Sequence, residues 1–318
     1  MNASRAILRR AAARAAWFTG ATAGLARLRL RKAPCVALLF HRVTEPGGPP
    51  GRIPMDEIAA DDLFARLEWL RRRAEMLPAE EWLRERQRPS RPGRPRVLVT
   101  FDDGYQDFAR LAVPACAALG IRPLLFVSTG FVDDRRARPW WDWLYRAAER
   151  PAGAEADLAR WKHLAFENPE DASAKVAAEA AARGWRPPTA DAPNEFCDWA
   201  MLRALRERAD FGAHGVSHAP LARLAPERLE EELRRPPERL EAELGARPTL
   251  LAYPYGDARA VSPAVRDAAR TAGYRAAFRS DGSADARGAA SFDLSRVVFP
   301  PGPVWRFAAH WARLRSGP

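Results

Sequence analysis

Two acidic residues stand where a predicted buried strand ends. The run from Val97 to Phe101 is almost entirely apolar, and Asp102, Asp103 and Gly104 follow it directly. Adjacent side chains of a regular strand point to opposite faces, so neighbouring carboxylates can serve one site only where the strand has ended. Glycine permits the turn that this requires. The pair therefore predicts either a functional site or a polar turn that caps the next helix.

Two histidines supply a partner for this acidic pair. His214 and His218 lie four residues apart, just after a short predicted strand near Phe211. One helical turn over this segment would place both imidazoles on the same side. Histidine is the commonest metal-binding side chain, and a catalytic zinc site typically has three protein ligands and a water. The spacing alone arises easily by chance, but with the strand-end acids it predicts two imidazole ligands, one carboxylate ligand and one spare carboxylate.

Short apolar runs alternate with longer amphipathic stretches along the chain. Alternating strands and helices indicate an α/β fold in which a parallel sheet has helices outside it. About seven strands favour a distorted or incomplete (β/α) barrel over a small open sheet, and in such barrels the chemistry lies at the carboxyl ends of the strands. We expect strands at 35–40, 96–101, 124–127, near 211, and at 249–253, 274–278 and 294–298. Between them we expect helices from about 61, and at 107–119, 198–208, 225–244 and 263–272.

The motifs resemble those of a known family. VTFDDGY at 99–105 and GAHGVSHAPL at 212–221 resemble the first two motifs of the polysaccharide deacetylases, carbohydrate esterase family four. LAYPYG at 251–256 is similar to the third motif, and the resemblance covers roughly residues 34–300. It implies metal-dependent removal of N-acetyl groups from amino sugars, with an N-acetylated polysaccharide or oligosaccharide as the partner. Relatives that act on exopolysaccharides look circularly permuted, as this chain does.

The resemblance implies a role for each motif residue. Asp102 matches the general base, while Asp103, His214 and His218 match the metal ligands. Tyr255 matches the position whose backbone N–H helps to hold the oxyanion. The expected cofactor is a divalent metal, zinc in the first place, with cobalt, manganese or iron as alternatives. Such a cation lowers the pKa of its water and polarises the acetamide carbonyl, and Asp102 would take the proton of that water.

The chain departs from the familiar pattern at two positions. In familiar members the general acid is a late histidine, but here the only late one, His310, lies in a predicted terminal helix. His41 ends the first predicted strand, as in permuted relatives, so we assign the acid to His41, with a structural histidine as the alternative. Ala252 stands where many members have the arginine that orients the base. Arg296 is a candidate replacement; an ion pair elsewhere is the alternative.

Positive charge is concentrated at the N-terminus. The net charge is +11, and residues 1–33 supply +8 of it from seven arginines and one lysine. The remaining chain is close to balance, so we expect no nucleic-acid partner. We predict that residues 1–33 are a basic extension that contacts the anionic inner membrane surface, with a solvated extension as the alternative. The apolar stretch at 15–26 is too short to span a bilayer and weak as a secretion signal, so we expect a cytoplasmic protein.

Residues 34–318 are expected to form the catalytic domain, with a helical insertion at about 131–196. Trp140 and Trp141 in this insertion could line a glycan groove or pack the insertion onto the barrel. Cys35, Cys116 and Cys197 are widely spaced, which indicates buried reduced thiols.

Two other functions stay open at this point. One is a deacylase of another N-acyl or O-acetyl compound, because the motifs do not define the groove. The other is an inactive glycan-binding scaffold in exopolysaccharide biosynthesis, whose only support is the missing arginine at Ala252.

Overall fold

The computed structural model describes residues 35–46, 57–88, 94–145, 154–185, 194–281, 289–300 and 302–312. Seven parallel strands form the centre of the domain, in the order β10–β1–β5–β6–β7–β8–β9. These strands are β1 (Cys35–Phe40), β5 (Arg96–Phe101), β6 (Leu124–Val127), β7 (Asp210–Ala213), β8 (Leu250–Ala252), β9 (Ala276–Phe278) and β10 (Arg296–Val298).

The sheet nearly closes into a barrel. A parallel bridge joins Phe278 at the end of β9 to Leu294, two residues before β10 begins. The backbone amide of Arg279 also donates to the carbonyl of Leu294 at 2.7 Å. The predicted α/β fold with about seven parallel strands in an incomplete barrel is thus confirmed. Three short strands were not predicted: β4 (Glu75–Met76) pairs with β5, while β2 (Arg42–Thr44) and β3 (Glu57–Ala59) pair with each other.

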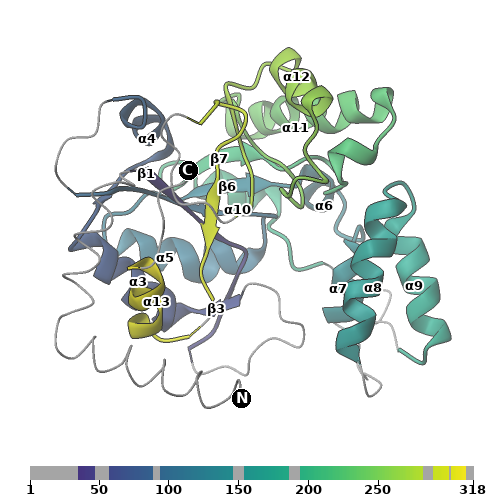
Figure 1. The fold of residues 1–318 in the computed structure, drawn as a ribbon, viewed down its shortest axis with the longest axis horizontal. Helices are drawn as coiled ribbons and strands as arrows, with labels where there is room; N and C mark the ends of the chain where they lie inside the picture. Colours follow the sequence, from purple (N-terminus) through teal and green to yellow (C-terminus); the bar gives the residue numbers. More distant parts are fainter. Residues whose placement is uncertain are drawn as a thin grey trace.

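Every residue of β1 and β5 is buried, as expected for parallel strands covered on both faces. Alternate residues of β1 enter different clusters: Val36 and Leu38 pack in the layer beneath the outer helices, while Cys35 and Ala37 pack with Phe126 of β6. The outer helices surround the sheet (Figure 1). They are α3 (Ala60–Arg71), α5 (Val113–Ala117), α10 (Trp199–Ala204), α11 (Pro226–Leu244), α12 (Pro263–Thr271) and α13 (Val304–Trp311). The short helix α4 (Ala79–Glu85) packs differently, because its Trp82 lies in the cluster that holds Cys35 and Ala37.

The helix predicted at 107–119 is not regular. A π-helical turn, η2 (Phe108–Ala112), precedes the short α5. Pro114 lies near the start of α5 and has no N–H for a regular helical bond to the preceding turn, which accounts for a change of register here. By contrast, α11 agrees with its prediction and ends at Gly245, whose φ of 79° suits glycine.

Helices fill the long connection between β6 and β7, beginning with α6 (Thr129–Asp133). We call the next three helices, α7 (Trp140–Tyr145), α8 (Ala154–Glu167) and α9 (Ala172–Ala182), the α7–α9 segment. This segment stands to one side of the barrel (Figure 1) and has its own buried cluster around Trp161 and Trp185.

All three cysteines are free and buried, as predicted. Among the described residues, no helix combines the length and the apolar character that a membrane span needs. The basic extension at 1–33 lies outside the described residues, so its membrane contact stays a prediction.

Candidate metal and catalytic site

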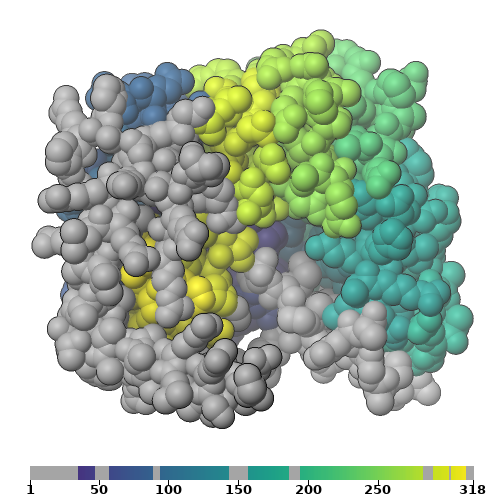
Figure 2. All heavy atoms as spheres, viewed as in Figure 1, coloured from purple at the N-terminus to yellow at the C-terminus, as the bar shows by residue number. Residues whose placement is uncertain are grey.

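All seven candidate site residues from the sequence analysis meet at the carboxyl end of the barrel. They line one pocket of about 720 Å³ together with residues of the α7–α9 segment. In Figure 2 a hollow separates the yellow C-terminal residues from the teal α7–α9 segment, with purple atoms of the N-terminal part visible at its base. The lining includes Leu39, His41, Asp102, Asp103, Trp140, Trp141, Leu158, Ala159, Lys162, His214, His218, Tyr253, Tyr255, Ser280, Arg296 and Val298.

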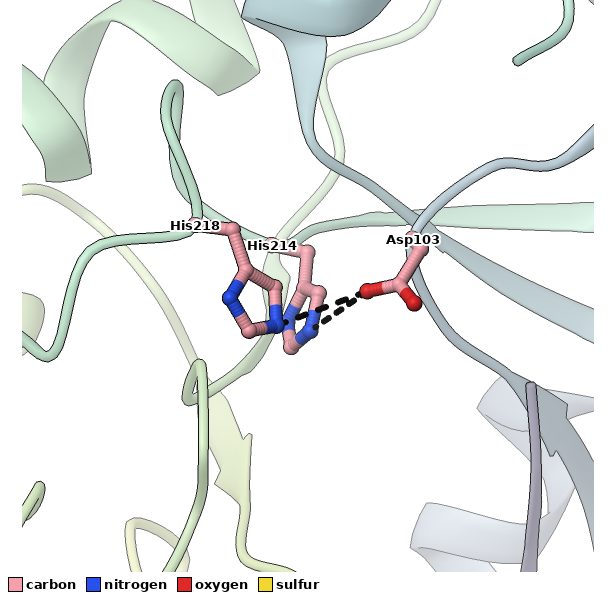
Figure 3. Close-up of side chains that lie close together, drawn as sticks. All are labelled: Asp103, His214 and His218. Carbon is pink, nitrogen blue, oxygen red and sulfur yellow. Dashed lines mark ion pairs between the residues drawn. The ribbon is translucent and has the colours of Figure 1, made fainter. Parts of the chain in front are cut away.

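Asp103, His214 and His218 point their ligand atoms at one another (Figure 3). Oδ1 of Asp103 lies 3.5 Å from Nε2 of His214 and 3.5 Å from Nε2 of His218, and the three ligand atoms all lie within 4.8 Å of one another. Donors held at about 2.0–2.2 Å from a tetrahedral zinc lie about 3.3–3.6 Å apart. The separations therefore fit a divalent cation at the centre of the triad.

The chemistry of the triad also fits a cation. Oδ1 of Asp103 is buried and has no hydrogen-bond partner among the described residues. Nδ1 of His214 lies 2.8 Å from the carbonyl oxygen of Ala252; it can donate to this acceptor, which leaves Nε2 with the lone pair that faces Asp103. Burial raises the pKa of Asp103 and lowers the pKa of His218, so desolvation opposes a charged Asp103, a cost that a bound cation would offset. Zinc and iron(II) both use two imidazoles and a carboxylate, so the triad does not identify the metal.

The backbone adopts an uncommon conformation at three of these positions. Among the described residues, the non-glycine residues with positive φ are Asp103 (74°), His218 (58°) and Tyr255 (63°), and all three line the pocket. Such conformations cost of order 1–3 kcal/mol each and concentrate at functional sites. Each of these residues lies in a turn after the end of a strand, and the turn directs its side chain or its amide into the pocket.

The helical turn considered for the two histidines does not form. The chain from His214 to His218 is a loop in which Gly215 has a φ of 74°. The imidazoles meet because the loop reverses on itself, with their ring centroids 4.8 Å apart. The spacing of four residues was thus informative, but the geometry expected from it was wrong.

Glu232 of α11 holds this loop, and the sequence reasoning missed it. Its carboxylate is fully buried and accepts hydrogen bonds from the amide of Val216 at 2.6 Å and from the amide and hydroxyl of Ser217, the latter at 2.6 Å. The available signal was its place on α11, since Glu232 lies four and eight residues before the buried Pro236 and Leu240. A charged residue on the apolar face of a helix calls for a buried partner.

Asp102 forms an ion pair with Arg296 and is not part of the triad. The guanidinium donates to both carboxylate oxygens at 2.6 and 2.7 Å, and also to the hydroxyl of Thr100 and the carbonyl of Arg279. Burial alone would raise the pKa of Asp102, but the charge of Arg296 is the largest influence that lowers it, and the pKa falls to about 2. Asp102 is therefore ionised at neutral pH, and its Oδ2 lies 3.7 Å from Nε2 of His214.

The remaining predicted site residues have distinct surroundings. His41 follows β1 in the same pocket, and its charge, when present, would lower the pKa of both Asp102 and Asp103. The carbonyl of Tyr255 accepts a hydrogen bond from the hydroxyl of Ser280 at 2.6 Å, and its ring lies 5.1 Å from that of His218. His310 lies outside the pocket lining, with its Nδ1 2.9 Å from the carbonyl oxygen of Arg306.

Trp140 and Trp141 of α7 both pack the α7–α9 segment and line the pocket, while their contact with a glycan stays a prediction. Trp140 and Trp141 line the pocket, yet they are only 9% and 6% exposed and belong to the buried cluster of the α7–α9 segment. Their indole N–H groups donate to the hydroxyls of Tyr255 and Tyr105, so the same residues pack the segment and form a wall of the site.

Comparison with known families identifies the chain. The sequence model of the polysaccharide deacetylases matches residues 90–277. This chain belongs to the polysaccharide deacetylase family. The matched region spans β5 to β9 and includes the acidic pair, both histidines of the triad and Tyr255.

Solved structures share the fold of this polysaccharide deacetylase. The IcaB structure from Ammonifex degensii is 23% identical, with a TM-score of 0.56 over 88% of this chain and 97% of that one. Streptococcus pyogenes deacetylase PplD in complex with acetate is 15% identical, with a TM-score of 0.57 over 85% and 92% of the chains. The BpsB deacetylase domain from Bordetella bronchiseptica is 15% identical, with a TM-score of 0.54 over 84% and 96%. A comparison with curated protein sequences finds no match.

Proposed function

We propose that this protein removes N-acetyl groups from amino sugars of a polysaccharide or of its precursor, with zinc as the native metal. The observation that carries the proposal is the joint presence of a cation-binding triad and an adjacent ionised carboxylate that is not a ligand. A protein that only bound glycan or metal would need no second carboxylate held so close to the triad. The family membership supports the same chemistry.

A divalent cation in the triad would polarise the acetamide carbonyl and lower the pKa of a water molecule. Asp102 would then accept a proton from the attacking water, because it is ionised and lies beside His214. Arg296 would keep the carboxylate oriented and charged until that step.

Tyr255 would act through its main chain. The hydrogen bond from Ser280 to its carbonyl fixes the peptide unit that joins Tyr255 to Gly256, and the positive φ of Tyr255 sets the direction of the preceding unit, which carries the N–H of Tyr255. We assign its N–H to the oxyanion that forms as the acetamide carbonyl is attacked, since preorganised backbone donors are effective at such charges.

His41 would protonate the leaving nitrogen. It approaches the pocket from β1, whereas Asp102 follows the neighbouring β5, so a base and an acid are supplied by adjacent strands. The amine must gain a proton as the C–N bond breaks, and histidine can supply one near neutral pH.

Acetate release after metal reconstitution tests the proposal. The metal-free protein should be loaded separately with zinc, cobalt, manganese or iron and incubated with N-acetylglucosamine oligomers and with exopolysaccharide. We expect acetate from at least one of these glycans, and the loss of activity on chelation. An O-acetylated glycan of the same backbone serves as the competing substrate, and preference for it would favour the deacylase alternative.

Two variants separate binding of the metal from turnover. Asp102→Asn should keep the metal and lose turnover by about 10²-fold or more, because the base is gone while the triad is intact. His214→Ala should lose both metal and turnover. Equal acetate release by wild type and both variants would reject the assignment. A metal-loaded wild type that releases no acetate from any of these glycans would support the inactive scaffold instead.

A further inference from the structure

The imidazole of His218 lacks the support that its partner ligand has. Nδ1 of His214 is satisfied by the carbonyl of Ala252. Nδ1 of His218 is buried, and among the described residues it has no acceptor beyond the backbone of His218 itself. Metal-binding histidines usually donate their second ring N–H to a fixed acceptor, which sets the orientation of the ring. His218 must therefore be oriented by something other than such a bond.

Aromatic rings surround His218 instead. The Trp141 ring lies 4.6 Å away at 72°, an edge-to-face contact, and the Tyr255 ring lies 5.1 Å away. Trp141 belongs to α7, 77 residues before His218 along the chain, so the ligand is packed against a separate helical segment and not only against the barrel. Edge-to-face contacts of this kind are worth about 0.5–1.5 kcal/mol beyond the area they bury.

Trp141 is itself fixed in place. Its indole N–H donates to the hydroxyl of Tyr105 at 2.7 Å, and both side chains are buried. The Tyr105 ring stacks on Phe196 with centroids 4.2 Å apart, and the guanidinium of Arg42 lies 4.0 Å from its centroid. Since Tyr105 follows Asp103 by two residues, Trp141 is tied to the same strand end that carries the carboxylate ligand.

We propose that Trp141 is a positioning residue for the metal centre: it holds the His218 imidazole with Nε2 toward Asp103, in place of a hydrogen bond to Nδ1. The α7–α9 segment then orients a metal ligand, in addition to forming a wall of the pocket. This inference rests on the proposed function only in using the same metal site. It concerns affinity for the metal, which is measured without any glycan.

The test compares Trp141→Leu with Trp161→Leu. Trp161 is a matched control, because it is fully buried in the same cluster and packs edge-to-face on Trp185 at 5.0 Å, while it does not line the pocket. Zinc affinity is measured by competition with a chromophoric chelator, and the geometry of the site by the visible absorption of the cobalt form. We expect Trp141→Leu to weaken zinc binding about 10-fold and to change the cobalt spectrum. Trp161→Leu should lower thermal stability but keep the affinity within about twofold.

If Trp141→Leu does not fold, Trp141→Phe replaces it in the same measurements. It keeps an aromatic ring but loses the N–H that anchors it to Tyr105, so we expect a several-fold weaker affinity and an altered cobalt spectrum. Wild-type affinity and spectrum in the Trp141 variants would overturn the proposal, as would an equal loss of affinity in Trp161→Leu. Failure of the proposed function would give a different result. The Trp141 variants would still bind zinc more weakly than the wild type, but the wild type would release no acetate.

Discussion

Arg296 binds both carboxylate oxygens of Asp102, at 2.6 and 2.7 Å, although 194 residues separate the two in the sequence. Arg296 opens β10 and Asp102 follows β5, and the two strands flank β1 in the barrel. The arginine that many family members carry in the third motif is replaced here by Ala252. A guanidinium from another strand thus occupies a position from which it can orient the proposed base.

Replacing Arg296 should shift the pH dependence of the reaction. The charge of Arg296 is the main influence that opposes burial and lowers the pKa of Asp102 to about 2. In Arg296→Met that influence is gone, the pKa rises, and the protonated, inactive form of the base persists to higher pH. The acid limb of the kcat/KM profile should therefore move upward by one pH unit or more. Arg296→Lys keeps a charge but not the two-pronged contact, so an intermediate shift is expected. An unmoved acid limb in the methionine variant would contradict this prediction.

His41→Ala should lower turnover by about 10²- to 10⁴-fold and leave zinc affinity unchanged, because the residue is proposed to move a proton and is not a ligand. The control is His310→Ala, since His310 lies on α13 outside the pocket lining. Steady-state kinetics and zinc competition check both variants. Full activity of His41→Ala would remove His41 from the mechanism.

Glu232 should matter for metal binding although it touches no metal ligand side chain. In Glu232→Ala the buried amides of Val216 and Ser217 lose their acceptor, and each unsatisfied donor costs about 1–3 kcal/mol. The loop that carries the two histidines should loosen, with a lower melting temperature and about 10-fold weaker zinc binding. The matched control is Glu230→Ala on the same helix, where Glu230 is exposed and forms an ion pair with Arg234. Similar effects of the two substitutions would argue against a special role of Glu232.

Two glycines with the same backbone conformation should respond differently to alanine. Gly256 (φ 61°) and Gly245 (φ 79°) both adopt the left-handed region, so alanine carries a similar backbone strain at each. A Cβ at Gly256 would lie 2.7 Å from the backbone nitrogen of Ser280, whereas one at Gly245 meets nothing within 4 Å.

Gly256→Ala should therefore displace the peptide unit that joins Tyr255 to Gly256 and, through it, turn the adjacent N–H of Tyr255. We expect kcat to fall by about 10²-fold, the size of the effect seen when an oxyanion donor is removed. Gly245→Ala should cost about 1 kcal/mol of stability and leave kcat unchanged. Kinetics together with thermal unfolding distinguish the two effects. If both variants keep wild-type kcat, the Tyr255 amide does not hold the oxyanion.

Local patterns in the sequence predicted the barrel and the meeting of two histidines with an acidic pair, while the choice of Asp103 as the third ligand came from the family resemblance. Short apolar runs predicted six of the seven parallel strands, and β7 (DFGA), which is only partly buried, was expected near Phe211. Strand-end positions pointed to Asp102, Asp103 and His41. This works because the carboxyl ends of parallel strands meet at one end of a barrel, whatever their separation along the chain. Residue type and place relative to a strand end are both readable from sequence.

Only the tertiary structure decided how these residues are held. The pairing of Arg296 with Asp102, the clamp of Glu232 on the histidine loop and the contact of Trp141 with His218 each join elements far apart in sequence. The left-handed backbone at Asp103 and His218 opposes local preference and persists because the surrounding fold imposes it. Periodicity and composition report what each segment favours by itself, while these contacts depend on which segments the closed barrel brings together.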